Sequence, residues 1–304
     1  MFDLIIIGGG PAGVAAGVYA TRKRLKTLLI TESFGGQSTE SLNIENWIGV
    51  KSISGVDFGK ALEEHLRSHT DGTVEIKTGD RVAGVLKSGE NFVVETTTNS
   101  YTTKTVLVTT GSTRKKLDVP GAQEFKNKGI SYCASCDGPL FADQDVAVIG
   151  GGNAAFETAA QLLAYAKSVT LLNRSDTLKA DEVTVEKLLA HPNMKIIKNS
   201  SPIEIKGDKF ISSLVYEKAG VKKELPVTGI FVEIGLIPTT NFVKDIVPLN
   251  TFGQIPVDPR TQRTDVNGLW AAGDSTDGLY HQNNIAAGDA VKALEDIYLY
   301  LHAK

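Results

Sequence analysis

Apolar and small residues follow the same pattern in two separate stretches of the chain. The first stretch comprises the apolar run Leu4–Ile7, the glycine turn GGGPAG (8–13), a helical pattern over 12–24 and the apolar run Thr27–Thr31. The second comprises Val146–Ile149, the turn GGGNAA (150–155), a helical pattern over 154–164 and the run Val169–Asn173. Because all these elements recur at an offset of 142 residues, we interpret the repeat as a whole βαβ unit.

The rest of the chain predicts how these two units are connected. Apolar, Thr-rich segments flank Asn99-Ser100 and predict a hairpin, and a strand at Gly268–Asp274 precedes a predicted C-terminal helix over Ile285–Leu301. Irregular stretches at Gly111–Ala122 and Gly235–Thr240 bracket the second unit. We therefore predict an α/β fold of two Rossmann-like dinucleotide-binding domains, the second (114–242) inserted into the first (1–113 and 243–304).

Each glycine turn has the form that binds a dinucleotide pyrophosphate, because its glycines permit a tight bend and a close approach of the backbone. The residue 24 positions after the leading glycine then distinguishes the ligands. In the first unit it is Glu32, a carboxylate suited to a free ribose diol, which indicates an FAD-like site. In the second it is Arg174, followed by Ser175 and Lys179, a set suited to the 2′-phosphate of NADPH.

Composition excludes several classes of protein. The 304 residues are 41% hydrophobic and 22% charged, and the 32 basic and 35 acidic residues form no long runs, so the footprint of a nucleic-acid binder is missing. We expect no membrane span, because no stretch approaches the roughly 20 apolar residues that one requires. Two cysteines cannot staple a secreted scaffold of this size, and we expect a cytoplasmic protein.

Those two cysteines, Cys133 and Cys136, form a C-x-x-C pair followed by Asp137. In one interpretation they open and close a redox disulfide while Asp137 moves a proton. In the other they are half of a zinc site, which needs two further ligands. His65 and His69 are the paired candidates for those ligands, but they lie far upstream and fit the exposed face of a helix beginning near Phe58. The spacing favours the redox pair and predicts no metal.

With two dinucleotide turns and a dithiol, the sequence resembles the low-molecular-weight thioredoxin reductase family along its whole length. The matching segments are GGGPAG, GGQS (35–38), IENWIG (44–49), CASCDGPLF (133–141), GGGNAA and AAGDS (271–275). The chain is also similar to the reductase portion of the alkyl hydroperoxide reductase flavoprotein, mainly in LKADEV (178–183) and GIFVEIGLIPTTNF (229–242). Both resemblances imply the class II type of pyridine nucleotide-disulfide oxidoreductase fold.

The resemblance also implies roles for individual residues. It makes Cys133 the sulfur that attacks the substrate disulfide, Cys136 the sulfur facing the flavin, and Asp137 the acid/base residue. The residues that it assigns to FAD are Gly8, Gly10, Pro11, Ala12, Gly13, Glu32, Gly36, Gln37, Asn46, Gly273, Asp274, His281, Gln282 and Asn283. Those that it assigns to NADPH are Gly150, Gly152, Asn153, Ala154, Ala155, Arg174, Ser175 and Lys179.

Two segments depart from the family pattern. Thioredoxin reductases show H-R-R-x-x-x-R after the second strand of the nucleotide unit, whereas this chain keeps only Arg174 of the three arginines. NADH therefore stays an alternative donor to NADPH, and ferredoxin, used by a few relatives, stays a third. The usual Arg-Gln-Ala near the flavin is His281-Gln282-Asn283 here, so we expect altered flavin packing or redox potential.

The resemblance implies a homodimeric reductase that passes electrons from NADPH through FAD and the dithiol to a thioredoxin-like protein disulfide. A peroxiredoxin-directed reductase is the alternative within the same chemistry. That branch carries an additional N-terminal thioredoxin-like region, whereas this chain begins directly at its first strand, so we place it second. A non-enzymatic nucleotide- or zinc-binding protein is the alternative from a different class.

Overall fold

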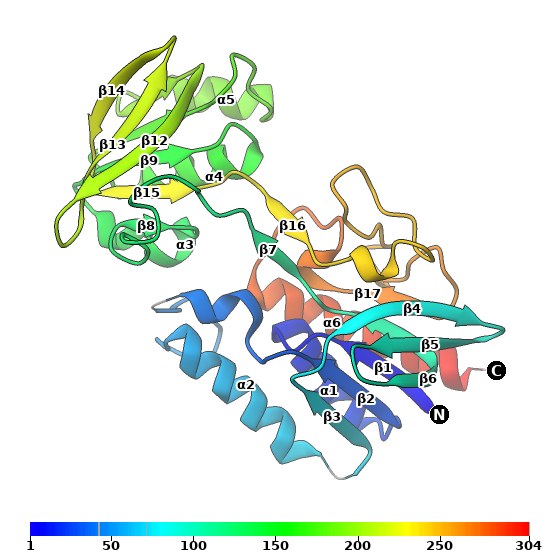
Figure 1. Ribbon diagram of the computed structural model, residues 1–304. Coiled ribbons are helices and arrows are strands. Elements are labelled where there is room, and N and C mark those ends of the chain that lie inside the picture. The colour runs from blue at the N-terminus through cyan, green and yellow to red at the C-terminus, as the bar shows by residue number, and fades with distance from the viewer. Residues whose placement is uncertain (42, 71, 304) are drawn as a thin grey trace. The chain divides into compact units, whose positions relative to one another are not determined.

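The computed structural model describes residues 1–41, 43–70 and 72–303, and they divide into two compact units (Figure 1). The first unit comprises Met1–Thr113 and Ile237–Lys304, and the second comprises Arg114–Leu236. The chain returns to the first unit at Ile237, before the residue 243 expected from the sequence. It does so because Thr239 already bonds to this unit: its N–H donates to the carbonyl of Gly111 (3.0 Å), and its carbonyl accepts from Thr110 Oγ1 (2.6 Å).

The first unit contains a parallel sheet with an antiparallel extension. Its elements are β1 (Phe2–Ile7), α1 (Pro11–Arg22), β2 (Thr27–Thr31), η1 (Gly36–Glu40), α2 (Gly55–His69), β3 (Val74–Thr78), β4 (Val82–Ser88), β5 (Asn91–Thr96), β6 (Ser100–Val108), η3 (Asn241–Val243), β17 (Leu269–Ala271), η4 (Gly273–Ser275) and α6 (Asn283–His302). Among the described residues the strand order is β3-β2-β1-β6-β5-β4, and β17 pairs with β6. β5 runs antiparallel to the first half of β6, as expected from the hairpin signal at Asn99, and β17 runs parallel to its second half.

The second unit repeats this architecture. Its elements are β8 (Ile130–Ser131), α3 (Ala134–Asp137), η2 (Gly138–Phe141), β9 (Asp145–Ile149), α4 (Asn153–Leu162), β10 (Ser168–Leu172), α5 (Glu182–Leu189), β11 (Met194–Ile197), β12 (Ser200–Gly207), β13 (Ile211–Lys218), β14 (Val221–Pro226) and β15 (Gly229–Val232). The strand order in its parallel sheet is β11-β10-β9-β15-β8, and β12, β13 and β14 form a separate antiparallel sheet. Short strands β7 (Ser112–Arg114) and β16 (Leu236–Pro238), which pair with each other, connect the two units.

The central strands are apolar on both faces because each sheet lies between two layers. In β1, Leu4 and Ile6 pack among residues of α1, α2 and α6, while Ile5 and Ile7 pack among residues of β4, β5 and the segment after η3. β9 alternates in the same way between α4 and the β12–β14 sheet. Strands covered on both sides read as continuous apolar runs, which is why Leu4–Ile7 and Val146–Ile149 stand out in the sequence. The predicted fold of two Rossmann-like units, the second inserted into the first, is confirmed.

Candidate dinucleotide and dithiol sites

The first glycine turn joins β1 to α1 and leaves the start of the helix open. Gly8 has φ +122°, and a Cβ on Gly13 would meet the carbonyl oxygen of Gly8, so both positions require glycine. Gly10 is the N-cap of α1 and provides no side-chain cap, and a Cβ placed on it would meet no atom within 4 Å. An uncapped helix start beside open space is the arrangement that accepts a phosphate, so this turn fits a dinucleotide.

The second glycine turn joins β9 to α4 in the same manner. Gly150 has φ +150°, and a Cβ on it would meet the backbone carbonyl of Glu233. Gly152 is the N-cap of α4, again with no side-chain cap and with no atom within 4 Å of a Cβ placed there. The helix tolerates Ala155 at the position that Gly13 occupies in the first unit. This turn also fits the pyrophosphate of a dinucleotide.

The other residues assigned to FAD come from both ends of the first unit. Glu32 follows β2 and is exposed, and its Oε1 lies 3.4 Å from Arg81 Nε. Residues near η1 meet residues at the start of α6: Asn46 Nδ2 donates to Gln282 Oε1 (3.2 Å), and Ser38 Oγ donates to Asn283 Oδ1 (2.9 Å). Segments more than 200 residues apart in sequence therefore meet beside the first turn.

Two further contacts complete this region of the first unit. His281 Nδ1 lies 3.4 Å from Asp274 Oδ1, which joins the departure from the family pattern to the AAGDS segment. Gln37 Nε2 donates to Ser112 Oγ (3.2 Å). Asn284, which the sequence analysis did not single out, donates from Nδ2 to the carbonyl of Asn46 (2.8 Å). Only its place next to His281-Gln282-Asn283 in the chain could have indicated it.

The loop after β10 packs against the second glycine turn. Lys179 N–H donates to the carbonyl of Gly151 (2.7 Å), and Asp181 N–H donates to Asn153 Oδ1 (2.9 Å). Asn173 is buried, and its Nδ2 donates to the carbonyls of Ser175 (2.8 Å) and Thr177 (3.0 Å), which closes the loop. The structure thus brings the residues that the sequence assigned to NADPH together around this turn, with Arg174 exposed.

Cys133 and Cys136 form a disulfide at the start of α3, with their Cα atoms 5.3 Å apart. Cys133 is the N-cap of this four-residue helix, and its carbonyl accepts from the N–H groups of Cys136 (3.2 Å) and Asp137 (3.0 Å). Both sulfur-bearing residues are half-buried. The pair follows β8 directly, so it lies at the carboxyl edge of the parallel sheet in the second unit.

Asp137 is held beside the disulfide by a serine that the sequence analysis did not identify. Ser131 Oγ donates to Asp137 Oδ2 (2.6 Å) and accepts from the N–H of Cys133 (3.1 Å). Burial raises the pKa of Asp137, and the Ser131 hydrogen bond and the charge of Arg114 offset part of that increase. A carboxyl with a raised pKa keeps its proton to higher pH, as an acid catalyst near neutrality requires.

Glu233 is a second buried carboxyl in the same unit, and the sequence analysis did not select it. It follows β15, its side chain is 14% exposed, and Oε1 accepts from Thr158 Oγ1 (2.9 Å) and lies 3.8 Å from Arg114 Nη1. Burial raises the pKa of Glu233, while Arg114 lowers it. Its neighbours in the chain carry no chemistry, so only an isolated acid after the apolar run GIFV could have indicated it.

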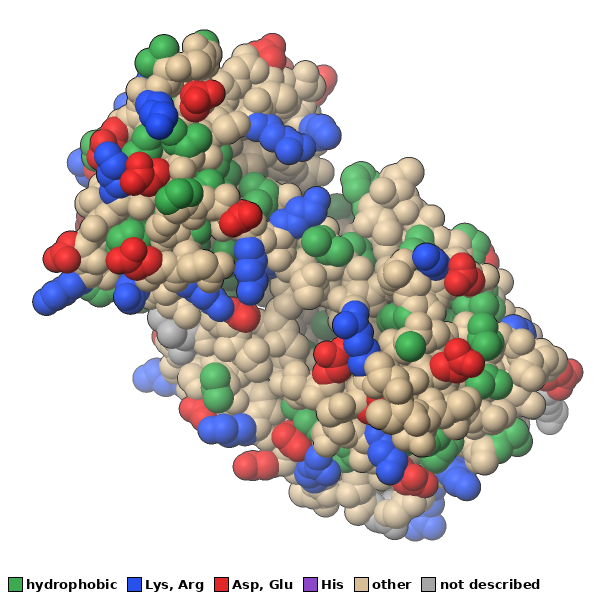
Figure 2. All heavy atoms as spheres, viewed as in Figure 1, with side chains coloured by type: hydrophobic (Ala, Val, Ile, Leu, Met, Phe, Trp, Pro, Cys, Tyr) green, Lys and Arg blue, Asp and Glu red, His purple; other side chains and the backbone are tan. Residues whose placement is uncertain are grey.

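The remaining surface offers no competing site among the described residues. Acidic and basic side chains are interspersed on the face shown in Figure 2. No group of three or more His, Cys, Asp or Glu side chains is placed to hold a metal within the described ranges. On α2, the rings of His65 and His69 meet edge to face with their centroids 4.8 Å apart. No helix in the described part of the chain is long and apolar enough to cross a membrane.

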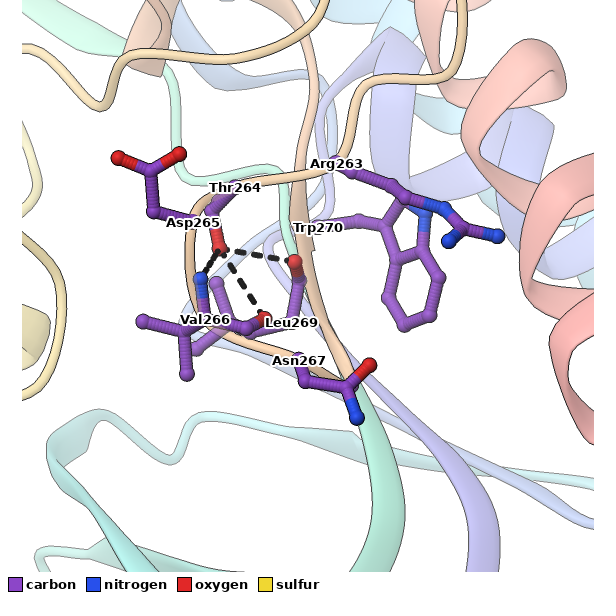
Figure 3. A pocket seen from close by; sticks show the side chains of 8 residues that line it. Arg263, Thr264, Asp265, Val266, Asn267, Leu269 and Trp270 are labelled. Atoms are coloured by element: carbon purple, nitrogen blue, oxygen red, sulfur yellow. Dashed lines mark hydrogen bonds between the residues drawn. The ribbon is translucent and has the colours of Figure 1, made fainter.

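A small pocket in the first unit lies at the amino end of β17 (Figure 3). A single turn lines it: Arg263, Thr264, Asp265, Val266, Asn267, Gly268, Leu269 and Trp270. Thr264 Oγ1 accepts from Val266 N–H (3.1 Å) and donates to the carbonyl of Leu269 (2.9 Å), so the turn satisfies its own polar groups. Because β17 is parallel to β6, this pocket lies at the sheet edge opposite the glycine turn, where dinucleotides do not bind.

Known proteins match this chain over nearly all of its length. The family model described as "Pyridine nucleotide-disulphide oxidoreductase" matches residues 2–290. The chain is 40% identical over 303 residues to "NADH dehydrogenase" of Bacillus subtilis (strain 168), covering 99% of this chain and 58% of that protein. It is 41% identical over 298 residues to an alkyl hydroperoxide reductase of Xanthomonas campestris pv. phaseoli, covering 96% of this chain and 56% of that protein. The chain therefore spans little more than half the length of these curated relatives.

A solved structure matches over the whole chain. The thioredoxin reductase of Streptococcus pyogenes MGAS5005 is 35% identical, has a TM-score of 0.89, and is covered to 99% by 100% of this chain. The expected resemblance to low-molecular-weight thioredoxin reductases is confirmed, and membership in this family implies FAD and NAD(P)H as cofactors.

Proposed function

The chain belongs to the pyridine nucleotide-disulphide oxidoreductase family, and we propose that within it this protein is a flavin-dependent reductase of protein disulfides. The observation that carries the proposal is the Cys133–Cys136 disulfide at the carboxyl edge of the nucleotide-binding sheet, with the buried carboxyl of Asp137 beside it. Two glycine turns with open helix starts accompany it, one for each cofactor.

In the proposed reaction the reduced cysteine pair exchanges with a substrate disulfide. The Cys133 thiolate attacks one substrate sulfur, forms a mixed disulfide and releases the other substrate sulfur as a thiolate. The Cys136 thiolate then attacks Cys133 Sγ, which restores the Cys133–Cys136 bond and releases the second substrate sulfur. The two electrons that opened the substrate disulfide come from the two enzyme thiols, which end as the disulfide seen here.

Asp137 supplies or removes the protons that this exchange requires. Protonated Asp137 donates a proton to a leaving substrate thiolate and recovers one when the enzyme dithiol forms again. Ser131 holds the carboxyl through Oδ2, and the same hydroxyl accepts from the backbone N–H of Cys133, so one side chain positions both the acid and the nucleophile.

We assign FAD to the first unit and the nicotinamide donor to the second. Bound flavin supplies the electron transfer between a nicotinamide donor and a disulfide. The chain contributes the turn at Gly8–Gly13 and the carboxylate of Glu32 for the adenosine half of FAD. For the donor it contributes the second turn and the exposed Arg174, whose guanidinium favours the 2′-phosphate of NADPH.

A thioredoxin-like protein is the substrate that we propose, supported by the match to the Streptococcus pyogenes thioredoxin reductase over the full chain. A peroxiredoxin-directed reductase is the second candidate, favoured by the 41% identity to an alkyl hydroperoxide reductase. We also propose a homodimer, which size-exclusion chromatography with light scattering will test.

An anaerobic titration of the purified yellow protein tests this function. We expect NADPH to bleach the flavin absorbance, and oxidised thioredoxin to restore it with formation of free thiols. The same titration with NADH identifies the donor. A colourless protein would contradict the proposal, and reoxidation by a peroxiredoxin carrier but not by thioredoxin would establish the second candidate instead.

A further inference from the structure

The carboxyl edge of the parallel sheet in the second unit carries its functional groups in a fixed order. Along the strand order β10-β9-β15-β8, the strands are followed by Arg174, the glycine turn at 150–152, Glu233 and the cysteine pair. Glu233 therefore lies between the pyrophosphate turn and the dithiol. The mechanism described above uses every group in this row except Glu233.

The connections of the sheet place Glu233 at the point where a dinucleotide crosses the edge. From β9 the chain moves through α4 to β10 and then to β11 on one side, whereas β15 lies on the other side of β9. Strand order thus reverses between β9 and β15, and ligands of open α/β sheets bind at this switch point. With the adenosine end at β10 and the pyrophosphate at β9, the next group, the nicotinamide riboside, extends over the end of β15.

The contacts of Glu233 leave one of its oxygens available to a ligand. Oε1 accepts from Thr158 Oγ1 and faces Arg114, whereas Oε2 accepts no hydrogen bond from the described residues. All buried side-chain oxygen and nitrogen atoms in those residues have partners, so Oε2 must be accessible to solvent. Such an oxygen on an otherwise buried side chain is a fixed acceptor at the edge of the sheet, because Thr158 and Arg114 restrain the carboxylate.

We propose that Glu233 is the nicotinamide-side contact of the donor site, with Oε2 accepting a hydrogen bond from an N–H or O–H group of the nicotinamide riboside. This inference rests on the proposed use of a nicotinamide donor. It adds to the donor site a residue that acts at the opposite end of the nucleotide from Arg174. A charge-assisted hydrogen bond of this kind contributes to affinity for the whole dinucleotide only.

Binding of a matched pair of nucleotides to the FAD-loaded protein tests the proposal by calorimetry. NADP⁺ carries the nicotinamide riboside, and 2′-phospho-ADP ends at the pyrophosphate; NAD⁺ and ADP replace them if the donor is NADH. In Glu233→Met, which keeps the length of the side chain without its oxygens, we expect NADP⁺ affinity to fall roughly tenfold or more while 2′-phospho-ADP binds as in the wild type. Glu186→Met, an exposed glutamate on α5, is the control and leaves both affinities unchanged.

Unchanged binding of 2′-phospho-ADP also shows that the variant is folded. Equal weakening of both probes in Glu233→Met, or no weakening of either, would overturn the subsite while leaving the proposed disulfide reductase intact. If the wild type binds neither pair of probes, the nicotinamide donor itself is wrong and the subsite fails with it. Reduction of thioredoxin by another donor would then separate the two failures.

Discussion

The two units differ at the place where β6 and β15, their corresponding strands, end. β6 ends at Thr109, whose hydroxyl donates to the carbonyl of Ile7 (2.8 Å), and β15 ends at the carboxylate Glu233. A Cβ on Gly8 would meet the backbone of Thr109, and one on Gly150 would meet that of Glu233, so the two residues hold equivalent places. One architecture therefore presents a backbone-tied hydroxyl at one turn and a carboxylate at the other, and single side chains set the chemistry.

The same contrast runs along the rest of each turn. At equivalent offsets the first unit has Glu32 where the second has Arg174, and Gly13 where the second has Ala155. A carboxylate suits a ribose diol and a guanidinium suits a phosphate, so one scaffold supports two different nucleotides. Only the second unit carries a cysteine pair at the edge of its sheet.

The largest expected effect comes from removing that cysteine pair. Cys133→Ser or Cys136→Ser should lower thioredoxin reduction by a factor on the order of 10³ or more, because the exchange requires both sulfurs. Flavin reduction by the nicotinamide donor, followed by absorbance, should continue in both variants. Ser135→Ala, between the cysteines, is the control, and substantial turnover by Cys136→Ser would contradict the proposed resolving step.

Removal of the acid should have the next largest effect. Asp137→Asn should lower turnover by about 10²-fold, the usual contribution of a general acid. Because burial raises the pKa of Asp137, the wild-type rate should fall as pH rises through that pKa, and the variant should lose this limb. Ser131→Ala removes a bond that lowers this pKa, so its limb should move to higher pH; an unchanged pH–rate profile in both variants would exclude Asp137 as the proton donor.

Exchanging the third residue of the two turns tests how far the scaffolds are equivalent. Gly13→Ala should destabilise the protein by about 1–3 kcal/mol, because its Cβ meets the carbonyl of Gly8. Ala155→Gly should cost only about 0.5–1 kcal/mol, the usual penalty for glycine in a helix. Denaturant unfolding measures both costs, and FAD content should fall only in Gly13→Ala. Similar losses in the two variants would show that the second turn is as tightly packed as the first.

A smaller effect should distinguish the two nucleotide pockets. Arg174→Ala should raise the KM for NADPH about tenfold and leave the KM for NADH unchanged, since only NADPH carries the 2′-phosphate. Steady-state kinetics with both donors measures the difference. Lys222→Ala, an exposed cation on β14, should change neither value. An equal change for both donors would remove Arg174 from the specificity site.

The smallest effect concerns the pH dependence of stability. Burial raises the pKa of Glu233, so the folded state holds that proton more tightly than the unfolded state. Its contribution to stability is present below the ordinary carboxyl pKa and is lost as pH rises through the raised pKa. Relative to Glu233→Gln, the wild type should therefore lose unfolding free energy between acid and neutral pH. Thr109→Val, at the equivalent place in the first unit, should show no such trend.

Local pattern was sufficient for most of the fold. The runs at Leu4–Ile7 and Val146–Ile149 and the glycine turns depend on residues near one another in sequence, so their spacing predicted β1, β9, α1 and α4 to within a few residues. The return to the first unit at Ile237 was predicted too late, because Thr239 joins that unit through bonds to Thr110 and Gly111. Such distant bonds leave no trace in local periodicity.

The sequence by itself determined the two glycine turns, the contrast of Glu32 with Arg174, and the cysteine pair beside Asp137, because each depends on short-range spacing. Only the tertiary structure decided that Ser131 holds Asp137 and that Glu233 lies between the pyrophosphate turn and the dithiol. β15 follows β8 by almost 100 residues yet pairs with it, since a parallel sheet orders its strands by packing and not by chain order. The ends of its strands therefore bring distant residues into one row.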